Sequence, residues 1–279
     1  MTWKKINVLM LGLKEGKIMD ISEGRFWDLP LGLIDGCTPC SIGCDHCWSA
    51  VMTNRFGVKG LTYCDKGKPC FTGEIITNPK RLDIILTRRK PTVYAVWNDF
   101  FHAEVMQNFR REVYDVIEKC QQHTFLILTK RAGIASERAE ELPNVWHGLT
   151  ICNQQEADEK IPIFLQVPGK KFLSIEPMLG SIDFKRECYC PLPSSIKIEW
   201  HLIGCPADNK WGIDAVILGG ETCGDRPGRP MKIEWAESIA DQCLAASVSL
   251  FVKQLHINGK LSKDIVEWPE KLQRRDLPW

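Results

Sequence analysis

Short apolar stretches rich in β-branched residues alternate with longer segments of helical periodicity over most of this chain. The stretches that predict strands lie at 92–97, 124–128, 145–151, 171–175, 215–218 and 249–252. The segments that predict helices lie at 48–56, 103–122, 131–142, 154–166 and 231–246. Parallel strands need a crossover connection, usually a helix, so this order predicts a parallel sheet. We expect an α/β fold, either a full or partial (β/α) barrel of about six to seven parallel strands or an open doubly wound sheet.

With 279 residues, the chain is long enough for one barrel domain that covers residues 1–279. An N-terminal extension is expected to contain a further strand near 6–13. Residues 61–91 are rich in Gly, Pro and Lys, which predicts an irregular excursion. Residues 185–212 are polar and contain three prolines, so we expect an insertion between two strands there.

Four cysteines, Cys37, Cys40, Cys44 and Cys47, lie close together in the run GCTPCSIGCDHCW. Thiolates this close repel one another and oxidise unless a soft metal centre holds them, so the run predicts a metal site. Structural zinc usually joins two C-x2-C pairs across a long spacer, whereas only three residues separate Cys40 from Cys44 here. Iron–sulfur clusters accept such short runs, and three ligands would leave one iron of a 4Fe–4S cluster open. The spacing favours iron–sulfur over a zinc knuckle or a set of reduced thiols.

The composition excludes several other classes of protein. The 36 basic and 35 acidic residues nearly cancel, so the average composition does not predict a strongly cationic surface. Thirteen cysteines without a secretory signal argue against a disulfide scaffold. No apolar stretch approaches membrane-spanning length, and we expect a cytoplasmic protein with no membrane partner. A second metal site at Cys188, Cys190, Cys205 and Cys223 is conceivable, but reduced thiols are favoured there and at Cys64 and Cys70.

Polar residues follow almost every expected strand. They are Asn98-Asp99, Thr129-Lys130-Arg131, Asn153, Glu176-Pro177, Gly219-Gly220-Glu221 and Lys253-Gln254. In parallel α/β folds, ligands bind at the carboxyl ends of strands, so these residues predict a functional pocket at one rim of the sheet. The cysteine run precedes the first well-defined helix and is expected at the same rim.

The chain resembles a phage-associated three-cysteine-motif family that is similar to the radical S-adenosylmethionine (radical SAM) superfamily. The resemblance covers residues 25–255 and depends on Gly36-Cys37-Thr38, Gly43-Cys44-Asp45 and Cys47, Asn98-Asp99-Phe100-Phe101-His102, Leu128-Thr129-Lys130-Arg131, Asn144-Val145-Trp146, Ser174-Ile175-Glu176-Pro177 with Leu179-Gly180, Gly219-Gly220-Glu221 with Arg229-Pro230-Met231, and Phe251-Val252-Lys253-Gln254. It implies a partial (β/α) barrel, a 4Fe–4S cluster and S-adenosyl-L-methionine as cofactors.

The resemblance also implies roles for individual residues. The narrower family implies Cys37, Cys44 and Cys47 as cluster ligands, and the superfamily spacing implies Cys40, Cys44 and Cys47. Further residues are implied to bind the cofactor, namely His46 beside the adenine, Asn98 and Asp99 at the methionine amino group, and Glu176, Gly219, Gly220 and Glu221. Catalytic roles are implied for Lys130, Arg131 and Glu176. Cys152 stands where the family commonly has an acidic residue.

The function expected from this resemblance is that of a radical SAM enzyme, in which a 5′-deoxyadenosyl radical abstracts hydrogen from a substrate. An external one-electron donor such as flavodoxin or ferredoxin would be required, and a further partner protein is conceivable. Basic stretches at 80–81, 88–90 and 274–275 suggest a nucleotide or nucleic-acid substrate. The alternative is a zinc or iron–sulfur protein that binds nucleic acid without catalysis.

Overall fold

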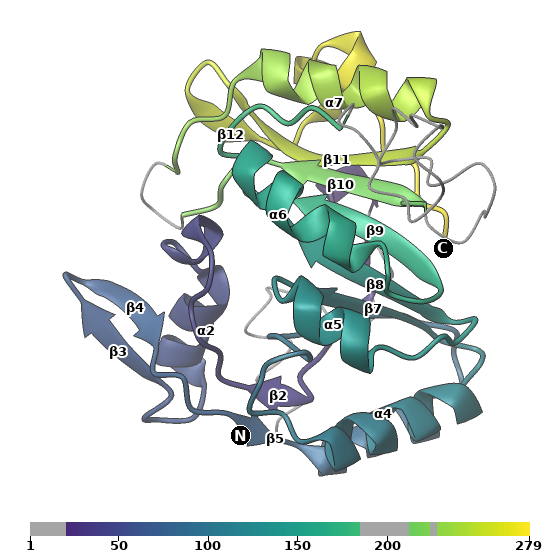
Figure 1. Cartoon of the computed structure of the whole chain (residues 1–279). Coiled ribbons are helices and arrows are strands. Elements are labelled where there is room, and N and C mark those ends of the chain that lie inside the picture. The colour runs from purple at the N-terminus through teal and green to yellow at the C-terminus, as the bar shows by residue number, and fades with distance from the viewer. Residues whose placement is uncertain (1–20, 185–211, 224–227) are drawn as a thin grey trace.

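The computed structural model describes residues 21–184, 212–223 and 228–279 (Figure 1). The strand expected near 6–13 and nearly all of the insertion expected at 185–212 lie outside these residues. None of the helices in the described part of the chain is long and apolar enough to span a bilayer.

An eight-stranded, mostly parallel sheet forms the centre of the structure. In spatial order its strands are β1 (Leu29–Leu31), β6 (Val93–Val96), β7 (Thr124–Thr129), β8 (Val145–Thr150), β9 (Lys170–Ile175), β10 (Ala215–Gly219), β11 (Ser249–Ile257) and β12 (Lys260–Ser262). Neighbours from β1 to β11 are parallel, and only β12 is antiparallel. The α/β fold with a parallel sheet is therefore confirmed. The strand order follows the chain order without the reversal of a doubly wound sheet.

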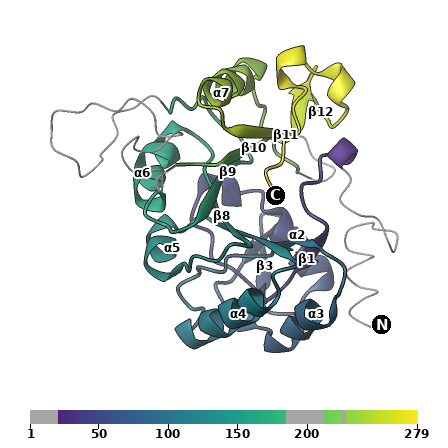
Figure 2. The ribbon, with the colours of Figure 1, turned by 90° about the vertical axis from the view of Figure 1, so that its right-hand side faces the viewer.

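Five helices that connect the described strands lie on one face of this sheet. Figure 2 shows α3 (Leu82–Thr87), α4 (Gln107–Lys119), α5 (Ala132–Arg138), α6 (Gln154–Phe164) and α7 (Ile233–Ala245) outside the curve of the strands. Alternate strand residues point toward these helices and are fully buried, among them Leu149, Leu173 and Leu218. This main core holds the helices against the outer face.

The inner face of the sheet has no helix from these crossovers and is covered differently. At its amino end lies a second apolar cluster that contains Phe26, Leu126, Trp146, Phe172, Ala215, Ile217 and Phe251. Trp279 packs on this cluster and donates a hydrogen bond from Nε1 to the Phe26 carbonyl at 3.1 Å. The C-terminal end of the chain accordingly lies on the inner side of the curved sheet (Figure 2).

The expectation of an irregular excursion at 61–91 is wrong. These residues form a hairpin of β3 (Thr62–Asp65) and β4 (Lys68–Phe71), then β5 (Ile76–Thr77) and α3. Strand β5 pairs with β2 (Ile34–Asp35), which fixes the start of the cysteine run. The sequence missed the hairpin because its turn, Lys66-Gly67, is not one of the usual hairpin dipeptides. Helix α2 (Trp48–Phe56) has the expected bounds and ends at Gly57.

Two glycines provide a test of how tightly the inner face is packed. A Cβ at Gly148 in β8 would overlap the Phe172 ring, whereas a Cβ at Gly133 in α5 meets no atom within 4 Å. We expect Gly148→Ala to lower the free energy of unfolding by about 1–3 kcal/mol because the ring must shift. Gly133→Ala should raise it by about 0.5–1 kcal/mol because alanine favours the helix. Urea unfolding of both variants measures these changes. Equal changes in the free energy of unfolding would contradict the tight packing at Gly148.

Candidate metal centre and surrounding pocket

The cysteine run forms a loop from Gly36 to Cys47 between β2 and α2. Gly36 has a φ of 94°, and a Cβ there would collide with the Glu74 backbone, so glycine is required where the loop begins. A 3₁₀ turn at Ile42–Cys44 is capped by the Ser41 hydroxyl, which accepts from the Gly43 N–H at 3.1 Å. The loop ends at Cys47, which is the N-cap residue of α2.

The cysteines of this loop form no disulfide with one another and influence one another's pKa. Cys37, Cys44 and Cys47 are partly buried, while Cys40 is exposed. A hydrogen bond from the Cys40 thiol lowers the pKa of Cys44 to about 5, and the same bond raises the pKa of Cys40. Burial raises the pKa of Cys47, and burial together with the Asp99 charge raises the pKa of Cys37 to about 11. Cys44 is therefore the sulfur that most readily becomes a thiolate.

The donor set of the loop fits a soft metal centre in its chemistry. Across residues 21–184, 212–223 and 228–279, no three His, Cys, Asp or Glu side chains stand in a metal-binding arrangement. The thiols nevertheless lie within electrostatic reach of one another, Cys37 with Cys47 and Cys44 with both Cys40 and Cys47. Sulfur donors of this kind select zinc or iron–sulfur centres.

Lys130 supplies a positive charge to these sulfurs from the end of β7. Burial alone would lower the pKa of Lys130. Electrostatic interactions with Cys44, Cys47, Cys152 and Asp99 outweigh burial and raise its pKa above the ordinary value. The ammonium group therefore stays charged beside the loop and favours the thiolate forms of its cysteines.

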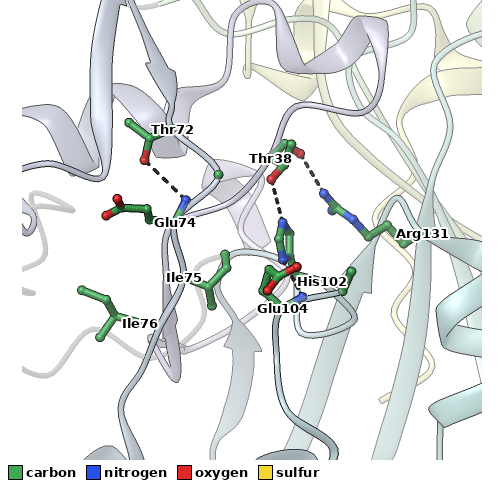
Figure 3. A pocket seen from close by; sticks show the side chains of 10 residues that line it. Thr38, Thr72, Glu74, Ile75, Ile76, His102, Glu104 and Arg131 are labelled. Carbon is green, nitrogen blue, oxygen red and sulfur yellow. Dashed lines mark hydrogen bonds between the residues drawn. The ribbon is translucent and has the colours of Figure 1, made fainter.

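Arg131 and Asp99 hold the loop against the strand ends. The Arg131 guanidinium forms an ion pair with Asp99 and donates to the Thr38 carbonyl at 2.8 Å (Figure 3). Its Nη1 also lies 3.9 Å from the Cys37 sulfur. Asp99 is almost fully buried and accepts further hydrogen bonds from the Thr129 hydroxyl and the Phe101 N–H. The ion pair thus fixes the first half of the loop.

Asn98 performs a similar task on the other side of the loop. It adopts a φ of 59°, which asparagine tolerates better than most residues. Its amide group donates to the Ile34 carbonyl at 2.8 Å, and its Oδ1 accepts from the Ser49 hydroxyl at 2.7 Å. Asn98 therefore joins the residues before the loop to the first turn of α2.

Glu221, which follows β10, is the centre of a charged network with His46. The buried carboxylate accepts from His46 Nδ1 at 2.9 Å and from the backbone and guanidinium of Arg229. Lys68 lies 3.0 Å from His46 Nε2. Because an ammonium group can only donate, His46 accepts at Nε2 and donates from Nδ1 to Glu221. Burial raises the pKa of Glu221, but hydrogen bonds from Arg229 and His46 lower it to about 2.

Glu176, Gly219 and Gly220 lie together at the ends of β9, β10 and β11. Glu176 forms an ion pair with Lys253, and its side chain packs against Gly219. Gly220 exchanges hydrogen bonds with Gln254, whose amide donates to the Gly220 carbonyl at 2.7 Å. The structure connects this group to the cysteine loop through Pro177, which packs beside Gly43.

Several residues of the site were not assigned a role from the sequence. The fully buried Cys152 lies 3.9 Å from the Ser41 hydroxyl and beside Gly43, so a fifth thiol touches the loop. Its place directly after β8 was the signal that could have found it. Lys68 reaches His46 through long-range packing, for which the sequence gives no signal. Arg229, which belongs to the stretches that carry the resemblance, pairs with Glu221.

A cavity of about 800 Å³ opens beside Thr38, between residues 72–76 and 102–104 (Figure 3). His102 Nδ1 accepts from the Glu104 N–H, so Nε2 donates to the Thr38 hydroxyl at 2.8 Å. Burial lowers the pKa of His102, which keeps its ring neutral. The exposed Glu74 and Glu104 give the cavity an acidic lining. A polar ligand bound there would lie directly against the cysteine loop.

Cys64 and Cys70, both in the described part of the chain, do not form a joint site. Register places Cys64 opposite Pro69 and Cys70 opposite Tyr63, so the two thiols lie on opposite faces of the hairpin. Cys223 is partly buried, and Cys188, Cys190 and Cys205 lie outside the described residues.

A mostly parallel α/β sheet with a cysteine loop fixed at its carboxyl ends defines the class of this protein. A family model described as "Protein of unknown function (DUF5131)" matches residues 26–275, and the chain belongs to this family. No curated protein and no solved structure matches the chain.

The low pKa of Glu221 makes stability depend on pH. The carboxylate stabilises the fold above its ordinary pKa of 4.5, and this contribution is lost as the pH falls through about 2. The shift corresponds to about 3 kcal/mol. We expect Glu221→Gln to lower the free energy of unfolding at pH 7 and to flatten its decrease between pH 4.5 and 2.

Urea unfolding at several pH values measures this effect. Glu112→Gln, on the exposed face of α4, is the matched control and should follow the parent protein. If the free energy of unfolding depends on pH in the same way for Glu221→Gln and the parent protein, the network does not stabilise the carboxylate.

Proposed function

We propose that this protein is a radical SAM enzyme with a 4Fe–4S cluster in the cysteine loop. The observation that carries the proposal is the position of the loop, at the carboxyl ends of parallel strands that are wound in chain order. Such winding supports a partial (β/α) barrel, whose ligand site lies at this rim. The chemistry that a reduced cluster and S-adenosyl-L-methionine supply when bound is a 5′-deoxyadenosyl radical that abstracts hydrogen from a substrate.

Three thiols would hold the cluster and leave one iron open for the cofactor. Cys44 and Cys47 belong to both ligand sets that the spacing allows. For the third we propose Cys37, because it is partly buried, as Cys44 and Cys47 are. Cys40 is exposed, so a cluster bound there would be open to water and oxygen.

The residues around the loop would orient the cofactor and balance its charge. Lys130 places a buried positive charge beside Cys44 and Cys47, which offsets the negative charge of thiolates. Arg131 and Asp99 hold the loop in place, and Asn98 fixes its junction with α2. We propose positioning roles for Asn98, Asp99 and Arg131, since the polar groups of their side chains already have partners within the chain.

The cofactor would lie at the carboxyl rim of the inner face, above the second apolar cluster. Ser174 and Gly219 are small residues near this rim, and Glu176 and Lys253 form a charged pair there. We propose that Glu176, Gly219, Gly220 and the His46–Glu221 pair border the cofactor. The apolar cluster below excludes water from the reaction. The substrate would be a nucleotide or nucleic acid, and a flavodoxin-like or ferredoxin-like protein would supply the electron.

Anaerobic reconstitution with iron and sulfide, followed by reduction with S-adenosyl-L-methionine, tests the proposal. We expect a brown protein with about four irons per chain and release of 5′-deoxyadenosine, measured by mass spectrometry. One zinc per chain without colour would support the alternative, a zinc protein that binds nucleic acid. An intact cluster that yields no 5′-deoxyadenosine would overturn the radical mechanism.

Single serine substitutions test the ligand assignment. We expect Cys37→Ser, Cys44→Ser and Cys47→Ser each to abolish most iron binding, because a three-ligand site cannot lose a thiolate. Cys40→Ser should keep it, as should Cys64→Ser on the exposed part of the hairpin. Iron and sulfide content per chain is the measurement. Retention in Cys37→Ser with loss in Cys40→Ser would make Cys40 the third ligand.

A further inference from the structure

Helix α2 and the β3–β4 hairpin form an arm, residues 48–71, that continues directly from the cysteine loop. Figure 1 shows the hairpin beside α2 and away from the main sheet. The Thr62 hydroxyl donates to Asn54 of α2 at 3.1 Å, which joins the two parts. The arm therefore presents its own surface next to the candidate metal centre.

Aromatic and basic side chains alternate on this arm. Phe56 is 47% exposed and Tyr63 is 53% exposed. Around them, residues 54–68 contain four basic residues, Arg55, Lys59, Lys66 and Lys68, against one acidic residue, Asp65. Residues 54–68 are therefore positively charged, whereas the whole chain is close to neutral with a net charge of +1.

The turn of the hairpin places a lysine where the backbone disfavours it. Lys66 and Gly67 have φ values of 47° and 76°, the two positive values of a type I′ turn. The other hairpin, β11–β12, has Asn258-Gly259 with φ values of 50° and 76°, which is the preferred dipeptide. A positive φ is unfavourable for lysine, so the tip of the arm carries its cation at a conformational cost.

One face of the hairpin leads back to the cysteine loop. Strand register places Tyr63 opposite Cys70 and Asp65 opposite Lys68, so Tyr63 and Lys68 share a face. Lys68 contacts His46, which lies between Cys44 and Cys47. A chain molecule bound along Tyr63 and Lys68 would therefore end at the candidate metal centre.

We propose that this arm binds single-stranded nucleic acid and presents an unpaired nucleotide to the cysteine loop. Exposed aromatic rings stack on unpaired bases, while lysine and arginine contact phosphates, and their alternation is typical of single-strand binding. That the strand is also the substrate rests on the function proposed above.

The other basic stretches are less suited to this role. Residues 88–90 are basic, but residues 82–93 around them contain no aromatic ring on which a base could stack. The arginines of the other two stretches already have partners. Arg81 is paired with Asp35, and Arg274 with Asp276, while Arg275 donates to backbone carbonyls. An acidic redox protein is the competing partner for the arm. The exposed rings of Phe56 and Tyr63 beside the basic residues favour nucleic acid, because unpaired bases stack on such rings.

Fluorescence anisotropy with labelled oligonucleotides and the full-length protein tests the proposal. We expect single-stranded DNA or RNA to bind more tightly than duplex of the same sequence. Tyr63→Ala and Phe56→Ala should each weaken binding by about tenfold through lost stacking. Leu244→Ala, at a highly exposed position on α7, is their control and should bind like the parent.

Lys66→Asn tests the charge at the tip without disturbing the turn, because asparagine favours a positive φ. We expect it to reduce the slope of log affinity against log salt by about 0.7, the value for one phosphate contact. Lys260→Asn, beside the other hairpin turn, removes the same charge and should leave the slope unchanged. Equal slopes for the two variants would overturn the proposal.

Circular dichroism of each variant shows that the fold is retained. No binding of any oligonucleotide by the parent protein, or binding of an acidic flavodoxin to the arm instead, would also overturn the proposal. Oligonucleotide binding does not require the cluster reaction. Binding without 5′-deoxyadenosine would therefore contradict the radical mechanism alone, and 5′-deoxyadenosine without binding would contradict the role of the arm alone.

Discussion

The arrangement of the whole structure depends on the order of the strands in its sheet. Since the parallel strands follow one another in chain order, the crossover helices α3 to α7 fall on a single face. The other face must be covered by segments that are not crossovers. Trp279 and the second apolar cluster cover its amino end, and the cysteine loop lies at its carboxyl end. The strand order therefore places the cysteine loop at the carboxyl end of the inner face, where a ligand could contact it.

Charge pairing fixes the loop at this position. On one side, the Arg131–Asp99 ion pair holds the Thr38 carbonyl, and on the other, Glu221 holds His46. The carboxylates of Asp99 and Glu221 are both buried. Breaking either pair would leave an unpaired buried charge, which is costly, so both pairs are expected to stay formed. Lys130 adds a cation that balances the sulfurs without an ion-pair partner on the loop. The loop thus has two anchors and a compensating charge.

The sequence was informative where one local pattern decides the structure. All six strands expected between 92 and 252 are present, because their buried apolar runs are flanked by clear polar ends. Strand β1 was missed, since three residues that include Pro30 carry no strand pattern. The β3–β4 hairpin was missed because its Lys66-Gly67 turn lacks the usual asparagine. The cysteine loop was found from spacing, but its contacts with Lys68, His102 and Cys152 depend on long-range packing, which no local pattern specifies.

The close approach of Gly43 to Cys152 bears on how the protein responds to air. A Cβ at Gly43 would lie 2.6 Å from the Cys152 sulfur and 3.4 Å from Pro177, so the space between loop and strand is already full. An oxygen atom added to that sulfur would need the same space and would lift the loop from the strand ends. Burial raises the pKa of Cys152 to about 12, which keeps the thiol protonated and slow to oxidise. The protonated Cys152 thiol therefore protects the tight contact between the loop and the strand ends from oxidation.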